Sequence, residues 1–172
     1  MTRAAVYGTG SWGTAFATLL ADAGADVTMW GRRAAVVDQI NAGCNEAYLP
    51  DHRLPAGIRA TTDPAAAAEG ADHVVLAVPS QTLRDNLGRW GGAIPSDASV
   101  VSLMKGVELG TTRRMSEVIT EVAEVEPERV VVVSGPNLAR EIVERHPAAS
   151  VVACVDDERA EAVAAACATQ TF

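Results

Sequence analysis

Three glycines, at the spacing Gly8-x-Gly10-x-x-Gly13, are the residues of this chain best suited to holding a ligand. The apolar run Ala4–Tyr7 precedes them and the amphipathic stretch Phe16–Ala23 follows, which predicts a strand, a tight turn and a helix. Gly8 would permit the sharp turn, Gly10 would let a pyrophosphate approach the backbone, and Gly13 would let the helix pack closely on the strand. The free N–H groups and partial positive charge of the helix N-terminus would face the phosphates. The pattern indicates a dinucleotide site; the alternative is a glycine-rich turn that holds no ligand.

Two arginines follow the second predicted strand, Ala25–Trp30, at the point where a dinucleotide-binding protein reads the ribose of its cofactor. A site for NAD usually carries an aspartate or glutamate there, which accepts a hydrogen bond from the ribose 2′-hydroxyl. In this chain the strand is followed by Gly31-Arg32-Arg33, and Asp26 lies at its opposite end. Arg32 and Arg33 would instead bind a 2′-phosphate through charge-assisted hydrogen bonds, which favours NADPH over NADH. The alternative is that both arginines are solvated residues at the start of a helix.

A lysine and a second glycine turn also follow predicted strands. Lys105 comes directly after the apolar run Val100–Met104, and its ammonium group could bond an anionic or carbonyl oxygen. Gly135-Pro136-Asn137 follows another predicted strand, and its glycine would allow a ligand to approach the backbone. An ordinary surface lysine and an ordinary strand-to-helix turn explain these two features equally well. Tyr48 could stack on a base or anchor its own loop.

These residues lie in loops of a chain whose apolar runs alternate with helical stretches, which predicts parallel strands joined by right-handed crossovers. In such a sheet the ligand lies beyond the carboxyl ends of the strands, where these loops would meet. Asp63 is expected to cap a helix that begins with Pro64. Strands are predicted at Ala4–Gly8, Ala25–Trp30, Ile58–Thr62, His73–Val78, Ser99–Met104, Val130–Val133 and Ser150–Val155, helices at Trp12–Ala23, Ala34–Ala42, Ala65–Glu69, Gln81–Trp90, Thr111–Val122, Asn137–Arg145 and Asp157–Ala168, and an irregular loop at Cys44–Gly57. The predicted fold class is therefore α/β, a Rossmann-like, doubly wound and mainly parallel sheet, with residues 1–172 forming one NAD(P)-binding domain.

Composition and charge narrow the class of protein further. The chain of 172 residues is 48% hydrophobic and 21% charged, as in a globular domain with a sizeable core. Its formal net charge of −8 and isoelectric point of about 4.8 argue against binding to nucleic acid or to an anionic membrane surface. The three cysteines lack paired spacing and fit a reducing compartment, and the three histidines are too dispersed to suggest a metal site. No secretory signal and no apolar run of membrane-spanning length is found, so a cytoplasmic protein without stable membrane association is expected.

Five motifs occur in order along the chain: Gly8-Thr9-Gly10-Ser11-Trp12-Gly13-Thr14-Ala15, Tyr48-Leu49-Pro50, Ala77-Val78-Pro79-Ser80, Lys105-Gly106-Val107-Glu108 and Gly135-Pro136-Asn137-Leu138-Ala139. In these motifs the chain resembles, over its whole length, the bacterial-type NAD(P)-dependent glycerol-3-phosphate dehydrogenases. The resemblance implies reduction of dihydroxyacetone phosphate, a small phosphorylated substrate, to sn-glycerol 3-phosphate with NADPH or NADH. The product would feed glycerophospholipid synthesis.

The same resemblance implies roles for individual residues. Lys105 would be catalytic, stabilising charge near the carbonyl oxygen that accepts the proton. Asn137 stands where the family often has a small hydroxyl residue, and Met104 replaces the more frequent serine before the Lys-Gly pair. In addition to the three glycines and Tyr48, the cofactor contacts would be Ser11, Trp12, Arg32, Arg33, Lys105 and Ala139, and the substrate contacts would be Lys105, Gly135 and Asn137.

The resemblance also implies a second, all-helical domain after the nucleotide-binding one. In the family that domain supplies the acid/base lysine and most of the phosphate pocket. We therefore expect the 172-residue chain to bind cofactor but to reduce dihydroxyacetone phosphate hardly at all, and the full-length protein could form a homodimer. Two alternatives are a related two-domain dehydrogenase that acts on another hydroxy or keto compound, and a nucleotide-binding regulatory module without catalysis.

Overall fold

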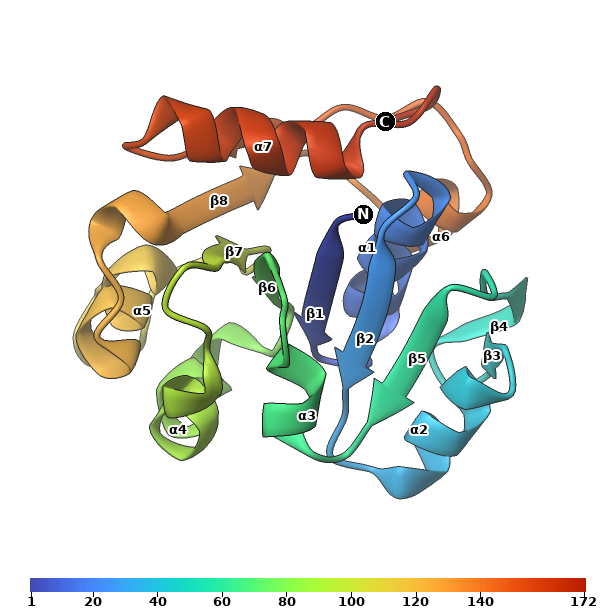
Figure 1. The fold of residues 1–172 in the computed structure, drawn as a ribbon, viewed down its shortest axis with the longest axis horizontal. Coiled ribbons are helices and arrows are strands. Elements are labelled where there is room, and N and C mark those ends of the chain that lie inside the picture. Colours follow the sequence, from blue (N-terminus) through green and yellow to red (C-terminus); the bar gives the residue numbers. More distant parts are fainter.

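The computed structural model describes residues 1–172 and shows a seven-stranded sheet with helices on both faces (Figure 1). The strands lie in the order β5-β2-β1-β6-β7-β8-β9; those from β5 to β8 are parallel, and β9 pairs antiparallel with β8 at the edge. The sheet strands are β1 (Arg3–Tyr7), β2 (Asp26–Trp30), β5 (Ile58–Thr61), β6 (His73–Leu76), β7 (Ser99–Ser102), β8 (Val130–Ser134) and β9 (Val151–Ala153). The α-helices are α1 (Ser11–Asp22), α2 (Ala34–Asn41), α3 (Pro64–Ala68), α4 (Leu83–Trp90), α5 (Met115–Ala123), α6 (Ala139–Val143) and α7 (Asp157–Cys167). This arrangement confirms the predicted Rossmann-like, mainly parallel sheet.

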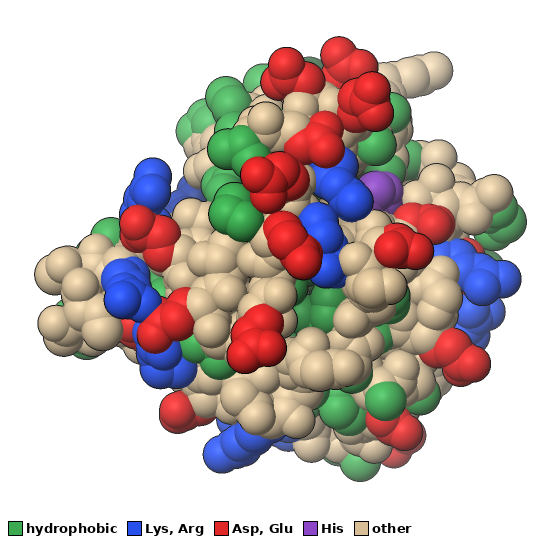
Figure 2. Space-filling model, turned by 60° about the vertical axis from the view of Figure 1, so that its left-hand side comes forward, with side chains coloured by type: hydrophobic (Ala, Val, Ile, Leu, Met, Phe, Trp, Pro, Cys, Tyr) green, Lys and Arg blue, Asp and Glu red, His purple; other side chains and the backbone are tan.

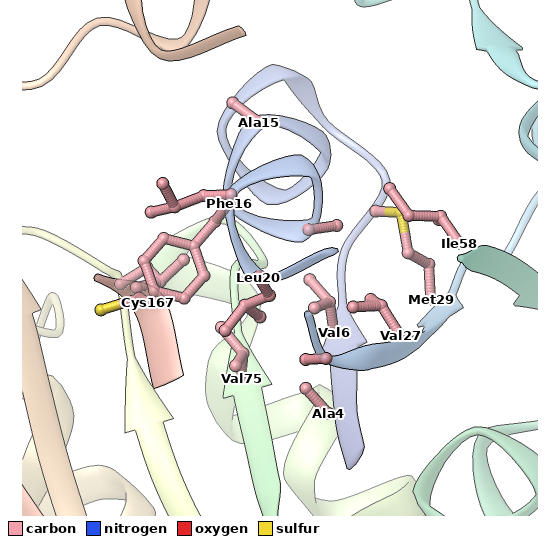
Figure 3. Packing of buried hydrophobic residues seen from close by; sticks show 14 of the residues in the cluster. Ala4, Val6, Ala15, Phe16, Leu20, Val27, Met29, Ile58, Val75 and Cys167 are labelled. Atoms are coloured by element: carbon pink, nitrogen blue, oxygen red, sulfur yellow. The ribbon is translucent and has the colours of Figure 1, made fainter. Parts of the chain in front are cut away.

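The sheet carries a hydrophobic core on each face because successive side chains of a strand point to opposite sides. Val6 of β1 lies in the core formed with α1, α2, α6 and α7, to which Phe16 and Leu20 also belong (Figure 3). Tyr7, the next residue of the same strand, lies in the core formed with α3, α4 and α5. Burial on both faces explains why the central strands are continuous apolar runs in the sequence.

Local hydrogen bonding determines where α3 begins. An oxygen of the Asp63 side chain accepts hydrogen bonds from the N–H groups of Ala65 and Ala66, at 2.9 and 3.3 Å. Pro64 occupies the first helical position, where its missing N–H leaves no bond unmade. The cap predicted at Asp63 is therefore confirmed.

Three segments differ from the sequence-based prediction. Cys44–Gly57, predicted as an irregular loop, contains an antiparallel hairpin of β3 (Cys44–Asn45) and β4 (Leu49–Arg53). A proline within β4 and the lack of alternating apolar residues hid these short strands. The helix predicted from Thr111 begins only at Met115, because a bridge between Val107 and Arg114 closes a turn before it. The helix predicted at 137–145 is confined to α6.

Acidic and basic side chains lie interspersed over the face shown in Figure 2. Elsewhere in the protein, as on this face, acidic and basic side chains can pair: Arg59 with Asp26 at 2.9 Å and Arg145 with Asp22 at 3.1 Å are two ion pairs of the structure. Exposed pairs of this kind contribute only about 0.2–1 kcal/mol each to stability. None of the helices combines the length and the apolar character that crossing a membrane requires.

Candidate functional site

A cavity of about 720 Å³ lies beyond the carboxyl ends of the four neighbouring strands β2, β1, β6 and β7. The chain winds outward in one direction from β1 to β5 and in the other from β6 to β8, so the order of the strands reverses between β1 and β6. Ligands of open α/β sheets bind at this reversal. Among the predicted site residues, the cavity is lined by Gly8, Gly10, Trp12, Gly13, Arg32, Arg33, Tyr48 and Lys105, whereas Ser11, Gly135, Asn137 and Ala139 do not line it.

The three glycines of the first turn have different surroundings. Gly8 has a φ of +127°, and a Cβ there would lie 2.6 Å from the carbonyl oxygen of Ala77. A Cβ on Gly13 would overlap the carbonyl oxygen of Gly8. The fold itself therefore requires Gly8 and Gly13. At Gly10, by contrast, a Cβ would meet nothing within 4 Å, so the backbone is open to whatever enters the cavity.

The N-terminus of α1 presents unpaired donors at the same place. The first hydrogen bond of the helix runs from the N–H of Thr14 to the carbonyl of Gly10, at 2.9 Å. The preceding N–H groups, from Gly10 to Gly13, donate to no acceptor in the protein, and the first turn contains no acidic side chain. Together with the open space at Gly10, these donors fit the pyrophosphate of a dinucleotide.

Two arginines that line the cavity are held differently. Nη2 of Arg33 donates to the hydroxyl of Tyr48 at 2.6 Å, and its guanidinium carbon lies 5.3 Å from the centre of that ring. Arg32 makes no hydrogen bond or ion pair within the protein. Tyr48 is held in turn, because its carbonyl accepts a hydrogen bond of 2.9 Å from Oγ of Ser11. Arg32 is therefore the guanidinium that remains available to an anion, while Arg33 and Tyr48 form a stacked wall.

Lys105 and the Gly135 turn meet, although they are 30 residues apart in the sequence. Nζ of Lys105 donates to the carbonyl of Gly135 at 2.8 Å. Asn137 does not line the cavity; its Nδ2 donates to Oγ of Ser150, and its buried Oδ1 accepts no hydrogen bond from the protein. Ala139 begins α6 and packs, half-buried, against the core around α1.

Side chains to which the sequence analysis gave no role hold the loop that carries Lys105. Gln81 donates to the carbonyl of Val107 and accepts from the N–H of Leu109, each at 2.9 Å. Glu108 accepts two hydrogen bonds from Arg84, at 2.8 and 3.0 Å. The partners are 24 to 28 residues apart, so no local pattern could have paired them.

Glu108 makes this part of the fold sensitive to acid. Hydrogen bonds from Arg84 and Thr111 lower the pKa of its carboxyl group to about 2, from an ordinary value of 4.5. Since the folded state has the lower pKa, the contribution of Glu108 to stability is present above pH 4.5 and is lost as the pH falls toward 2. We expect Glu108→Gln to lower the free energy of unfolding at neutral pH, by an amount that shrinks over this interval. Urea unfolding at several pH values measures the difference, with the unpaired Glu161→Gln as control; a deficit that did not change with pH would contradict the ion pairing.

Comparisons with known proteins identify the family of this chain. Residues 3–160 match the family described as NAD-dependent glycerol-3-phosphate dehydrogenase N-terminus. The glycerol-3-phosphate dehydrogenase (NAD(P)+) of Streptomyces griseus is 60% identical over 171 residues, which cover 99% of this chain and 51% of that protein. That of Thermobifida fusca is 53% identical over 174 residues, which cover 100% of this chain and 52% of that protein. The chain thus spans about half the length of the curated relatives it matches.

Solved structures show the same fold. The crystal structure of glycerol-3-phosphate dehydrogenase from Coxiella burnetii matches with a TM-score of 0.91 and 30% identity, covering 99% of this chain and 52% of that one. The enzyme of the same name from Saccharomyces cerevisiae matches with a TM-score of 0.86 and 25% identity, covering 99% of this chain and 55% of that one. Sequence and structure agree, and the chain belongs to the NAD-dependent glycerol-3-phosphate dehydrogenase family, whose N-terminal part it matches.

Proposed function

We propose that this chain forms the cofactor-binding part of an enzyme that reduces dihydroxyacetone phosphate to sn-glycerol 3-phosphate, with NADPH as the preferred reductant. The convergence of the glycine turn, Arg32 and Lys105 on one cavity carries this assignment. A turn that only joined a strand to a helix would not need the open space at Gly10. The names of the relatives support the reaction for a protein that includes this chain.

The cavity offers a complementary group for each part of a dinucleotide. The N–H groups at the start of α1 suit the pyrophosphate, and the stacked pair of Arg33 and Tyr48 suits the flat face of an adenine. Arg32 suits a 2′-phosphate because its guanidinium has no partner in the protein, and β2 ends without an acidic residue that would bind a free hydroxyl. These groups support NADPH as the preferred cofactor.

Lys105 is assigned to the carbonyl oxygen of the substrate, where charge develops during reduction. A reduced nicotinamide bound in the cavity would supply the hydride for the carbonyl carbon. An ammonium group has three N–H donors, so the bond from Lys105 to Gly135 directs the side chain and leaves two donors free. Asn137 is assigned to the substrate as well, on the family resemblance alone, because it does not line the cavity.

The proposal extends to the pathway, the cellular compartment and the oligomeric state of the enzyme. We place the product in glycerophospholipid synthesis, the protein in the cytoplasm, and the full-length enzyme in a homodimer. Three free cysteines support a reducing compartment. The pathway and the dimer rest on the family resemblance.

Two measurements test the function. Calorimetric titration of the 172-residue chain with NADPH and NADH tests cofactor binding, and steady-state kinetics test the reaction in a fusion with the C-terminal half of the Streptomyces griseus relative. We expect the chain to bind NADPH and the fusion to oxidise it in the presence of dihydroxyacetone phosphate. Failure to bind either nucleotide would refute the proposal. Turnover only with other keto compounds would indicate a related dehydrogenase, and binding without any turnover in the fusion would indicate a regulatory module.

The different settings of the two arginines predict cofactor choice. We expect Arg32→Ala to weaken NADPH binding by about 10- to 100-fold, because hydrogen bonds to a charged group are lost. NADH binding should stay nearly unchanged. Arg33→Ala should weaken both cofactors, because it removes the partner of Tyr48. Calorimetry at low and high salt measures both effects, and Arg32→Ala should also reduce the salt dependence of NADPH binding. With the exposed Arg89→Ala as control, equal losses of NADPH and NADH in Arg32→Ala would show that this residue does not read the 2′-phosphate.

A further inference from the structure

Asn45 is a fully buried polar side chain that reaches the glycine turn from a distant part of the chain. Its exposed fraction is 0%. Its Nδ2 donates to the carbonyl of Thr9 at 3.0 Å and to Oγ1 of Thr14 at 2.8 Å. Thr9 lies between the first two glycines of the turn, and Thr14 lies on α1. One amide on the hairpin therefore holds both the turn and the helix into which it leads.

The Oδ1 of Asn45 is buried and accepts no hydrogen bond from the protein. What the side chain does provide is a fixed donor for the Thr9 carbonyl. The other hydrogen bond to that carbonyl, from Oγ1 of Thr14, is long at 3.4 Å.

The planarity of the peptide bond carries the effect of Asn45 to the cavity. In a trans peptide the C=O and N–H groups point in opposite directions. The chain contains no cis peptide bond, so fixing the carbonyl of Thr9 toward Asn45 turns the N–H of Gly10 the other way. Gly10 lines the cavity, and its N–H donates to nothing in the protein.

We propose that Asn45 is a positioning residue for the pyrophosphate of the cofactor: its buried amide holds the Thr9–Gly10 peptide so that the Gly10 N–H stays directed at the phosphate. This inference rests on the proposed function, because it names a residue that prepares the same site before the nucleotide binds. A second contact between the hairpin and the turn, from Ser11 to the carbonyl of Tyr48, is exposed and acts on the following residue. The buried contact from Asn45 is the one that orients the Thr9–Gly10 peptide.

The test removes the amide without adding charge. Asn45→Leu has nearly the same shape but no donor, and Asn41→Leu is the matched control. Asn41 also holds a main-chain carbonyl, that of Ala60, at 3.0 Å, and it lies outside the cavity lining. Calorimetry compares NADPH with adenosine 2′-monophosphate, which has no pyrophosphate. We expect Asn45→Leu to bind NADPH about tenfold more weakly, the effect of misaligning one hydrogen bond to a charged group, and to bind adenosine 2′-monophosphate like the wild type. Asn41→Leu should change neither affinity.

A second readout needs no nucleotide. Nitrogen-15 relaxation reports how rigidly the N–H of Gly10 is held in the free protein. Its order parameter should fall in Asn45→Leu and stay unchanged in Asn41→Leu. If Asn45→Leu does not fold, Asn45→Ser replaces it, because a serine cannot overpack the site and is too short to reach the Thr9 carbonyl. The same NADPH-selective loss is expected for that variant.

The outcomes separate this inference from the proposed function. Unchanged NADPH affinity, or an unchanged Gly10 order parameter, would overturn the role of Asn45 while leaving the dinucleotide site in place. An equal loss of affinity for both nucleotides would also overturn it, because the change would then act through the stacked pair of Arg33 and Tyr48 rather than through the glycine turn. A wild-type chain that did not bind NADPH would refute the proposed function, and the inference with it.

Discussion

Replacing Lys105 by alanine is expected to lower kcat/KM for dihydroxyacetone phosphate by about 100-fold or more, the usual cost of removing a donor aimed at developing charge. The measurement uses the fusion with the C-terminal half of the Streptomyces griseus relative. The side chain of Lys105 is exposed, and its hydrogen bond goes to the carbonyl of Gly135, so the melting temperature should change little. A catalytic loss without a loss of stability would separate chemistry from folding.

Two variants and one labelling experiment define what Lys105 does. Lys105→Arg keeps the charge but replaces a compact ammonium with a planar group, so it should restore only part of the activity. Arg89→Ala removes an exposed cation away from the cavity and should leave the kinetics unchanged. Lys105 is the only lysine of the chain, so acetylation followed by mass spectrometry reports on this side chain directly, and bound NADPH should slow its modification. Near-normal kinetics for Lys105→Ala would show that Lys105 is an ordinary surface lysine without a catalytic role.

Gly10→Val is expected to weaken NADPH binding by at least about tenfold, or 1.4 kcal/mol, while the fold survives. The backbone at Gly10 is extended, with φ −72° and ψ 175°, a conformation that valine adopts readily. A Cβ there meets no protein atom within 4 Å, so the added isopropyl group would fill space that the pyrophosphate needs. Calorimetry measures the loss of affinity, and thermal unfolding shows whether the fold is retained.

Two other glycines provide the controls for this experiment. A Cβ on Gly88, in α4, also meets nothing within 4 Å, so Gly88→Val should leave NADPH binding unchanged. Gly8→Ala should instead destabilise the fold, because φ is +127° and the new Cβ would lie 2.6 Å from the carbonyl of Ala77. If Gly10→Val bound NADPH with wild-type affinity, the pyrophosphate would not bind against Gly10.

Local signals were enough to predict the strands and helices of the main sheet that hold the site, but not the β3–β4 hairpin. The cap at Asp63 and the proline after it act within three residues, and the structure confirms both. The continuous apolar runs predicted central parallel strands, since a strand buried on both faces needs an apolar residue at each position. The order of strands and helices then predicted the edge of the sheet at which the loops would meet.

The pairing of side chains between those loops could not be predicted in this way. Arg32 and Arg33 are identical in type and adjacent in sequence, and only the position of Tyr48 makes one engaged and the other free. Asn45 lay in a segment without apolar alternation, so neither its strand nor its contact with Thr9 had a local signal. The two hydrogen bonds of Gln81 with the loop after β7 likewise depend on how two loops approach each other.

The sequence by itself determined the alternating elements, the glycine turn and the position of Lys105 at the carboxyl ends of the strands. Backbone conformation, helix capping and burial pattern act over a few neighbouring residues, so they can be read locally. The tertiary structure decided that Lys105 bonds to Gly135, that Asn45 supports the turn, and that β9 runs antiparallel at the edge. Each of these contacts joins residues that are distant in sequence. Their distances and directions are set only when the strands have paired and the helices have packed on both faces of the sheet.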